Sequence, residues 1–160
     1  VYAIDLNIEM LKYAQKKIKK EKKEKIFFLK ANAEKLPFKD NFFDKYIISF
    51  CLRNVTHINK ALVEANRILK PGGIFYCLEF STPESSLVNF IYSKYKNKII
   101  PLIGKNIANN KSAYRYLEES IDFFPNQENL LELLNKNGFF ETKYLNLYNG
   151  IVSIHIGYKI

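Results

Sequence analysis

The sequence predicts an α/β fold with a largely parallel sheet, and three observations carry this prediction. Short apolar runs typical of strands alternate with amphipathic helical stretches through the first half of the chain. The run Tyr46–Phe50 is nearly continuously apolar, which is typical of a buried parallel strand. Near the end of the chain, Phe140–Leu147 and Ile151–Tyr158 alternate around Tyr148-Asn149-Gly150, which predicts an antiparallel hairpin.

The other elements are predicted from hydrophobic periodicity and turn residues. The predicted strands are Val1–Asp5, Ile26–Leu29, Asp44–Phe50 and Ile74–Phe80. A helix follows Asn7, a cap residue, with Ile8, Leu11, Tyr13 and Ile18 on one stripe. The other predicted helices are Asn59–Leu69, Leu87–Ile103, Ala113–Phe123 and Asn129–Asn137. In the helix Asn59–Leu69 we expect five inward residues, namely Ala61, Leu62, Ala65, Ile68 and Leu69, and a stop at Pro71-Gly72-Gly73.

The composition predicts one globular domain over residues 1–160. The chain is 48% hydrophobic and 26% charged, and no apolar stretch reaches membrane-spanning length. Because it starts at Val1, with neither an initiator methionine nor a signal peptide, we expect an N-terminally truncated domain. Cys51 and Cys77 lie in apolar runs, so we expect two buried free thiols. We expect no metal, since no cluster of His, Cys and Asp has ligand spacing.

The formal net charge is +9, and seven of the lysines fall in Lys16–Lys25. A solvated helix end and loop is the simpler interpretation of this run. The alternative is attraction to nucleic acid or to an anionic membrane face. Glu residues interleave with the lysines, which argues against nucleic acid.

Polar residues follow three successive strands at the edge where open α/β sheets bind ligands. Asp5 ends the first strand, and its carboxylate can accept both hydroxyl hydrogens of a ribose; it can equally be a capping acid. Asn32 and Ala33 follow the next strand, where an amide and a backbone N–H can contact an adenine edge; an Asx-turn is the alternative. Ser49 lies near the end of Tyr46–Phe50 and completes the row.

Arg53 and Asn54 follow that strand, in a position where catalytic loops of such sheets lie. A guanidinium and an amide can hold a phenolate or carbonyl oxygen, although Arg53 can instead pair with a nearby carboxylate. Tyr114 and Tyr116 lie on a predicted helix, as substrate contacts or as half-buried packing. His155 shares the strand face of Ile151, Ser153 and Gly157, and is either a substrate contact or a buried polar group.

Six segments together carry a family resemblance: Asn32–Phe38, Leu52–Thr56, Arg67–Gly73, Leu78–Ser81, Tyr114–Ile121 and Gly150–Lys159. With them the chain resembles the ubiquinone/menaquinone biosynthesis C-methyltransferases, the UbiE-type family, over essentially its whole length. The Leu-Lys-Pro-Gly-Gly run occurs in many methyltransferases, whereas Arg53–Thr56, the Tyr114–Ile121 pattern and the C-terminal segment are specific to this family. Arg53–Ile58 and Cys77–Ser81 look closest to the mitochondrial branch.

The resemblance implies a class I, Rossmann-like methyltransferase sheet with a C-terminal antiparallel hairpin. It implies transfer of a methyl group from S-adenosylmethionine to a ring carbon of a polyprenylated benzoquinol, with no metal. By the family pattern Asp5 binds the ribose, Asn32 and Ala33 the adenine side, and Ser49 the cofactor pocket. Arg53 and Asn54 are then the catalytic candidates, and Tyr114, Tyr116 and His155 the substrate-binding candidates.

The implied partners are the benzoquinol substrate, other quinone-biosynthesis proteins, a second copy in a homodimer and a membrane surface contacted peripherally, without nucleic acid. The implied location is the matrix side of the mitochondrial inner membrane, or the cytoplasm in a bacterium. Phe90–Ile103 is the sequence candidate for lining an apolar channel around the polyprenyl tail, and core packing explains it almost as well.

The sequence departs from the family pattern in two places. Cys51 stands where the family has glycine, which puts the pocket width there in doubt. The first strand and its glycine-rich loop, central in family members, are missing ahead of Val1. We therefore expect two inner sheet edges that pair with another chain or rearrange onto each other. Two other functions stay open: methylation of another small molecule, or a non-catalytic subunit of a quinone-biosynthesis complex.

Overall fold

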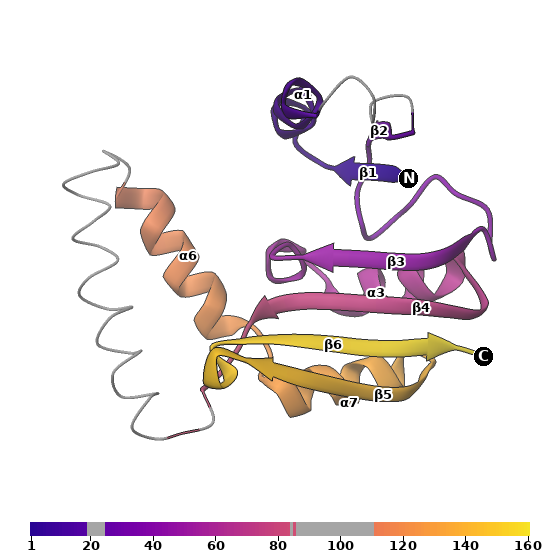
Figure 1. Ribbon diagram of the computed structural model, residues 1–160. Helices are drawn as coiled ribbons and strands as arrows, with labels where there is room; N and C mark the ends of the chain where they lie inside the picture. The colour runs from indigo at the N-terminus through magenta and orange to yellow at the C-terminus, as the bar shows by residue number, and fades with distance from the viewer. Residues whose placement is uncertain (19–24, 84, 86–110) are drawn as a thin grey trace.

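The computed structural model describes residues 1–18, 25–83, 85 and 111–160 (Figure 1). The elements in chain order are β1 (Tyr2–Asp5), α1 (Ile8–Lys17), β2 (Phe27–Lys30), β3 (Phe43–Ser49), the 3₁₀ turn η1 (Leu52–Asn54), α3 (Ile58–Ile68), β4 (Leu69–Phe80), α6 (Lys111–Phe123), α7 (Gln127–Lys136), β5 (Phe139–Leu147), the 3₁₀ turn η3 (Tyr148–Gly150) and β6 (Val152–Lys159). Each predicted element within these ranges is present. The predicted helix Leu87–Ile103 and the channel candidate Phe90–Ile103 lie outside the described residues.

The strands form two separate sheets. β1 and β2 pair in parallel, and a four-stranded sheet has the order β3-β4-β6-β5. β3 and β4 are parallel, whereas β6 is antiparallel to both β4 and β5, which confirms the predicted hairpin. β1 and β3 do not pair within the described structure, so direct pairing of the two inner edges was a wrong expectation. Pairing of these edges with another chain stays a prediction.

Helices α3 and α7 lie behind the four-stranded sheet in the view of Figure 1 and cover one of its faces. The five residues predicted to face inward from the first of these helices are all buried, with Leu62 and Ala65 at 0% exposure. Four of the five, all except Ile68, belong to one core cluster with Leu130 and Leu134 of α7 and Phe75 of β4. Leu69 itself belongs to β4, because α3 ends one residue earlier than expected.

The opposite face of β3 is open, which corrects the prediction of a strand buried on both sides. Ile48 is buried against the helices, but its neighbour Ile47 points the other way and is 72% exposed. The apolar run therefore predicted the strand correctly, but its burial was predicted correctly for one face only. No described helix is long and apolar enough to span a membrane.

An aromatic cluster links the two sheets. Tyr2 of β1 lies within ring-stacking or edge distance of Phe27, Phe38, Phe42 and Phe43, with ring centroids 5.1 to 6.2 Å away. Such pairs add about 0.5–1.5 kcal/mol each to the burial of their area. Because Phe38 and Phe42 belong to the segment between β2 and β3, this cluster holds β1 against the chain that leads into the larger sheet.

Two local predictions have different outcomes. Asn7 caps α1 as expected, since its Oδ1 accepts a hydrogen bond from the N–H of Glu9 at 2.9 Å. Both thiols are free and Cys77 is buried, but Cys51 is exposed. The prediction of burial was wrong for Cys51 because β3 ends at Ser49 and the chain leaves the sheet before it.

We predict that Leu62→Ala lowers the free energy of unfolding by about 2–5 kcal/mol, because it empties a fully buried site between α3 and the sheet. Val63→Ala, at the next and 52% exposed position, is the matched control and should change stability by less than about 0.5 kcal/mol. Urea unfolding of both variants checks this. Equal losses would show that α3 does not present the Leu62 face to the sheet.

Candidate active site at the strand ends

The carboxyl ends of β1, β3 and β4 point toward the same side of the molecule, where α6 also lies (Figure 1). Carboxylates from two of these strands act on one residue that follows β3. Partial burial raises the pKa of the Cys51 thiol, and the carboxylates of Asp5 and Glu79 raise it further. Asp5 comes from the small sheet and Glu79 from the large one, so the residues after β3 lie between the two.

Asp5 ends β1 and stays half-buried. Its Oδ1 accepts a hydrogen bond from the N–H of Asn7 at 2.7 Å, so it fixes the turn into α1. This is the capping role that the sequence left open, but one bond to one oxygen does not fill a carboxylate, which accepts at both oxygens. Asp5 can therefore hold a ribose hydroxyl and the turn together.

Asn32 and Ala33 follow β2 in a tight turn. The Oδ1 of Asn32 accepts from the N–H of Glu34 at 2.9 Å, and its backbone carbonyl accepts from the N–H of Lys35 at 3.0 Å. This is the Asx-turn alternative. The turn uses the side-chain oxygen, so what Asn32 can offer a ligand is its NH₂ group. Ala33 packs against the core of the larger sheet, which fixes its backbone N–H.

Ser49 is exposed at the end of β3, and its place in a cofactor pocket stays a prediction. The next residue, Phe50, has a φ of 50°, and its N–H is held by the Leu78 carbonyl at 2.8 Å. A bulky residue in the left-handed region is strained, and such strain clusters at functional sites. Cys51 has a φ of −130°, which any residue adopts, so the backbone at this position does not need glycine.

Arg53 lies in η1 and pairs with a buried carboxylate. Its Nη1 donates to Oε2 of Glu79 at 2.8 Å, and its backbone N–H donates to Oε1 at 3.3 Å. The Glu79 side chain is 1% exposed and that of Arg53 10%. Burial raises the pKa of Glu79, and Arg53 partly offsets the increase. The guanidinium also lies over the Phe80 ring, 5.5 Å from its centre.

The guanidinium is not saturated by this pair. Its Nε is buried without a partner among the described residues, as is the hydroxyl of Ser81 just after β4. Buried donors are almost always satisfied, so an orphan Nε indicates a place for a ligand or water. The pairing with a carboxylate, one of the two alternatives stated from the sequence, is present, and a catalytic role of Arg53 stays a prediction.

Asn54 and Tyr116 meet across the site. The Tyr116 hydroxyl of α6 donates to Oδ1 of Asn54 at 3.0 Å. Tyr116 and Arg53 border a cavity of about 390 Å³, whose lining also includes Thr56, Ser120 and Phe124. The structure therefore brings together one of the predicted substrate contacts, Tyr116, and the predicted catalytic pair. Tyr114 lies in α6, and its side chain is outside the described part of the structure.

His155 is placed under α7, with its side chain 1% exposed. Its Nε2 lies 2.9 Å from the backbone carbonyl of Gln127, and because a carbonyl only accepts, Nε2 carries the proton. Nδ1 lies 3.4 Å from the Ser153 hydroxyl. These contacts are those of a satisfied buried polar group, the alternative stated from the sequence, and substrate binding by His155 stays a prediction without support from them.

Sequence reasoning missed Glu79 and Ser81 as site residues. A signal for Glu79 was available, because an acid inside the apolar strand Ile74–Phe80 must have a buried partner. Ser81 gave no such signal. Among the described residues, no three His, Cys, Asp or Glu side chains gather as a metal site.

Solved structures share this fold. A SAM-dependent methyltransferase of Thermotoga maritima, described as a possible histamine N-methyltransferase, superposes with a TM-score of 0.70 at 25% identity, over 99% of this chain and 72% of its own. A SAM-dependent methyltransferase of Aquifex aeolicus gives 0.68 at 18% identity, over 100% and 69%. The fold is that of a class I methyltransferase.

The sequence comparisons define the family. The model of the ubiE/COQ5 methyltransferase family matches residues 1–159, so the chain belongs to this family. It is 52% identical over 98% of its length to the ubiquinone/menaquinone biosynthesis C-methyltransferase UbiE of Rickettsia prowazekii, and spans 63% of that protein. It is 46% identical to the mitochondrial 2-methoxy-6-polyprenyl-1,4-benzoquinol methylase of Bos taurus, over 100% of this chain and 49% of the bovine protein.

We predict that His155 makes folding stability depend on pH. Burial lowers the pKa of His155 from its ordinary value of 6.5, so the unfolded chain binds the proton better than the folded one. Its stabilising contribution is present above pH 6.5 and is lost as the pH falls below it. In His155→Gln the free energy of unfolding should therefore fall less between about pH 7.5 and pH 5.5 than in the parent.

Urea unfolding at the two pH values measures this difference. His57→Gln is the matched control, because His57 is exposed and its substitution should leave the parent's pH dependence intact. Identical pH dependence in the parent and in His155→Gln would contradict the assignment of a neutral buried imidazole.

Proposed function

We propose that the protein transfers a methyl group from S-adenosylmethionine to a ring carbon of a polyprenylated benzoquinol in ubiquinone or menaquinone biosynthesis. The observation that carries this proposal is the guanidinium of Arg53, held by a buried carboxylate beside a cavity that Tyr116 also borders. The Tyr116 hydroxyl in turn holds the side chain of Asn54. A pocket with fixed donors at strand ends suits an acceptor that develops negative charge on oxygen. The names of the UbiE and benzoquinol methylase relatives support the same substrate class.

Carbon alkylation needs an electron-rich ring. A hydroquinone gains a nucleophilic ring carbon when a phenol proton leaves, because the phenolate oxygen donates density into the ring. A guanidinium such as that of Arg53 is a poor proton acceptor, because it already carries its proton and holds it tightly. Its role is to hold the developing phenolate through the N–H groups that Glu79 leaves free. Asn54, oriented by the Tyr116 hydroxyl, adds an amide N–H to the same oxygen.

Glu79 fixes where that positive charge sits. Two hydrogen bonds, one to the backbone and one to the guanidinium, tie η1 to β4. Since both partners are buried, water does not screen the pair, and the guanidinium is oriented before substrate arrives. Burial alone would favour a neutral carboxyl in Glu79, and Arg53 counteracts this effect.

The donor side of the site lies at the ends of β1 and β2. The bound donor supplies an electrophilic sulfonium methyl group. Asp5 has the chemistry to accept ribose hydroxyls, while the Asn32 NH₂ and the Ala33 N–H face the adenine. Ser49 completes the pocket at the end of β3. This donor set of carboxylate, amide and backbone N–H fits a nucleoside, and the neighbouring Cys51 adds no charge, because its pKa is raised.

The polyprenyl tail needs an apolar surface. In the described part of the chain Phe123 and Phe124 border the cavity, and Phe123 is 89% exposed. We assign the first isoprene units of the tail to these rings. Peripheral contact with a membrane, in mitochondria or at the bacterial inner face, would deliver such a substrate. A homodimer or association with other quinone-biosynthesis proteins is compatible with this assignment.

The test uses Arg53→Lys in the full-length protein with S-adenosylmethionine and a short-chain benzoquinol. Lysine keeps the charge opposite Glu79 but lacks the planar fork of donors. We expect kcat to fall by roughly 10²–10³, the loss typical of one oxyanion donor, and the Kd of the donor to change little. Methyl transfer assays and calorimetry measure the two quantities on one sample.

Arg115→Lys is the matched control. The Arg115 side chain is 76% exposed on α6, and in the described structure it forms an ion pair with Glu119 of the same helix. It should keep turnover. A lower melting temperature with near-normal turnover of Arg53→Lys would make Arg53 a structural ion-pair partner and remove it from the catalytic site. A parent protein that binds the donor but methylates no benzoquinol would favour another acceptor.

A further inference from the structure

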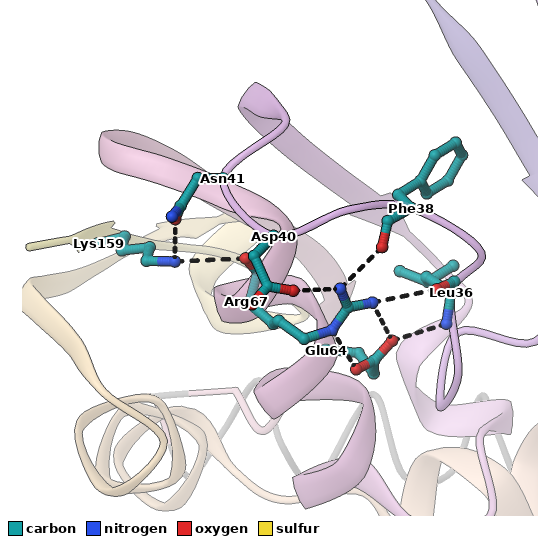
Figure 2. A network of polar contacts seen from close by, with 7 residues as sticks. All are labelled: Leu36, Phe38, Asp40, Asn41, Glu64, Arg67 and Lys159. Carbon is teal, nitrogen blue, oxygen red and sulfur yellow. Dashed lines mark hydrogen bonds and ion pairs between the residues drawn. The ribbon is translucent and has the colours of Figure 1, made fainter.

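Arg67, in the last turn of α3, has every donor of its guanidinium occupied (Figure 2). Nε and Nη2 donate to the two carboxylate oxygens of Glu64 at 2.7 and 2.8 Å. Nη1 donates to the carbonyl of Phe38 at 2.8 Å and to Asp40 at 2.7 Å, and Nη2 also donates to the carbonyl of Leu36 at 3.0 Å. Three of the four partners thus belong to residues 36–40.

Glu64 completes the clamp. Its Oε2 accepts the N–H of Leu36 at 2.7 Å, and the bond from Arg67 is the main reason why its pKa is lowered. Most of these contacts use backbone atoms of the segment, so they fix its path whatever its side chains are. Lys159 of β6 adds a bond to Asn41 at 2.7 Å, which fixes the end of the same segment (Figure 2).

The clamped segment is the continuation of the turn that carries Asn32 and Ala33. That turn has a second anchor, because Oε1 of Glu34 accepts from the N–H of His57 at 3.0 Å, at the start of α3. The segment from Asn32 to Asp40 is therefore held at both ends of α3. Since the two sheets do not pair in the described part of the chain, no ladder of backbone hydrogen bonds there places Asn32 relative to Arg53.

We propose that Arg67 is a positioning residue for the nucleoside part of the methyl donor. It acts through the 36–40 segment on Asn32 and Ala33 and does not touch the donor itself. The inference rests on the proposed function. A guanidinium fits this task because its planar fork bonds several acceptors at once, which an ammonium cannot do.

The experiment compares Arg67→Lys with the parent in the full-length protein. We expect the Kd and KM for S-adenosylmethionine to rise about tenfold, the equivalent of one or two lost hydrogen bonds, while kcat at saturating donor stays within about twofold. Asp40→Asn is a milder variant, since it weakens one exposed contact and leaves the backbone clamp. It should raise the donor Kd by about two- to threefold.

Lys70→Ala is the matched control, because it removes an ion pair of similar length, 2.8 Å to Asp44, outside the clamped segment. It should leave the donor Kd unchanged. A lower melting temperature of Arg67→Lys with an unchanged donor Kd would overturn this inference and make the network purely structural. The proposed function would be unaffected by that result. A parent protein that binds no donor would overturn the proposed function, and this inference with it.

Discussion

The position of the small sheet relative to the large one depends on side chains, and the site depends on that position. Among the described residues no strand of β1-β2 pairs with a strand of the other sheet. Three devices replace the missing ladder: the rings around Tyr2, the guanidinium of Arg67, and Glu34 on the start of α3. All three act on the segment between β2 and β3. The position of α3 therefore determines where this segment places Asn32 and Ala33.

The loop after β3, where Arg53 lies, is fixed in a different way, by local backbone strain and by the buried Arg53–Glu79 pair. Burying two charges costs several kcal/mol per ion, which a hydrogen-bonded pair offsets only in part, so such a pair is weak evidence for stability. The φ of 50° at Phe50 adds strain of about 1–3 kcal/mol in the same loop. Burial of apolar side chains in the core of α3, α7 and β4 offsets this cost in folding free energy. The strained loop and the buried pair in turn fix the guanidinium beside the cavity.

The sequence predicted the elements well and the long-range partners poorly. Periodicity and turn residues are local, and they located every described strand and helix. The prediction that Ile47 is buried was wrong, because an apolar run does not show which face of a strand is covered. The place of β6 between β4 and β5 was not predicted either, because strand order depends on contacts between segments far apart in the chain. Arg67 and its carbonyl partners lie 29 and 31 residues apart in the chain, and no spacing rule connects an arginine to a backbone oxygen.

Arg53 and Arg67 show how the structure separates two roles that the sequence cannot. Each is an arginine bonded to a glutamate, within a family motif. All donors of Arg67 end on protein atoms, so this side chain has nothing left to offer a ligand and can only fix its surroundings. Arg53 keeps a buried Nε without a partner in the described structure, beside a cavity. An unsatisfied donor is costly in an empty site and useful in a filled one. The number of occupied N–H groups, and not the presence of an ion pair, is therefore the ground on which we propose that Arg67 frames the site and that Arg53 meets the substrate.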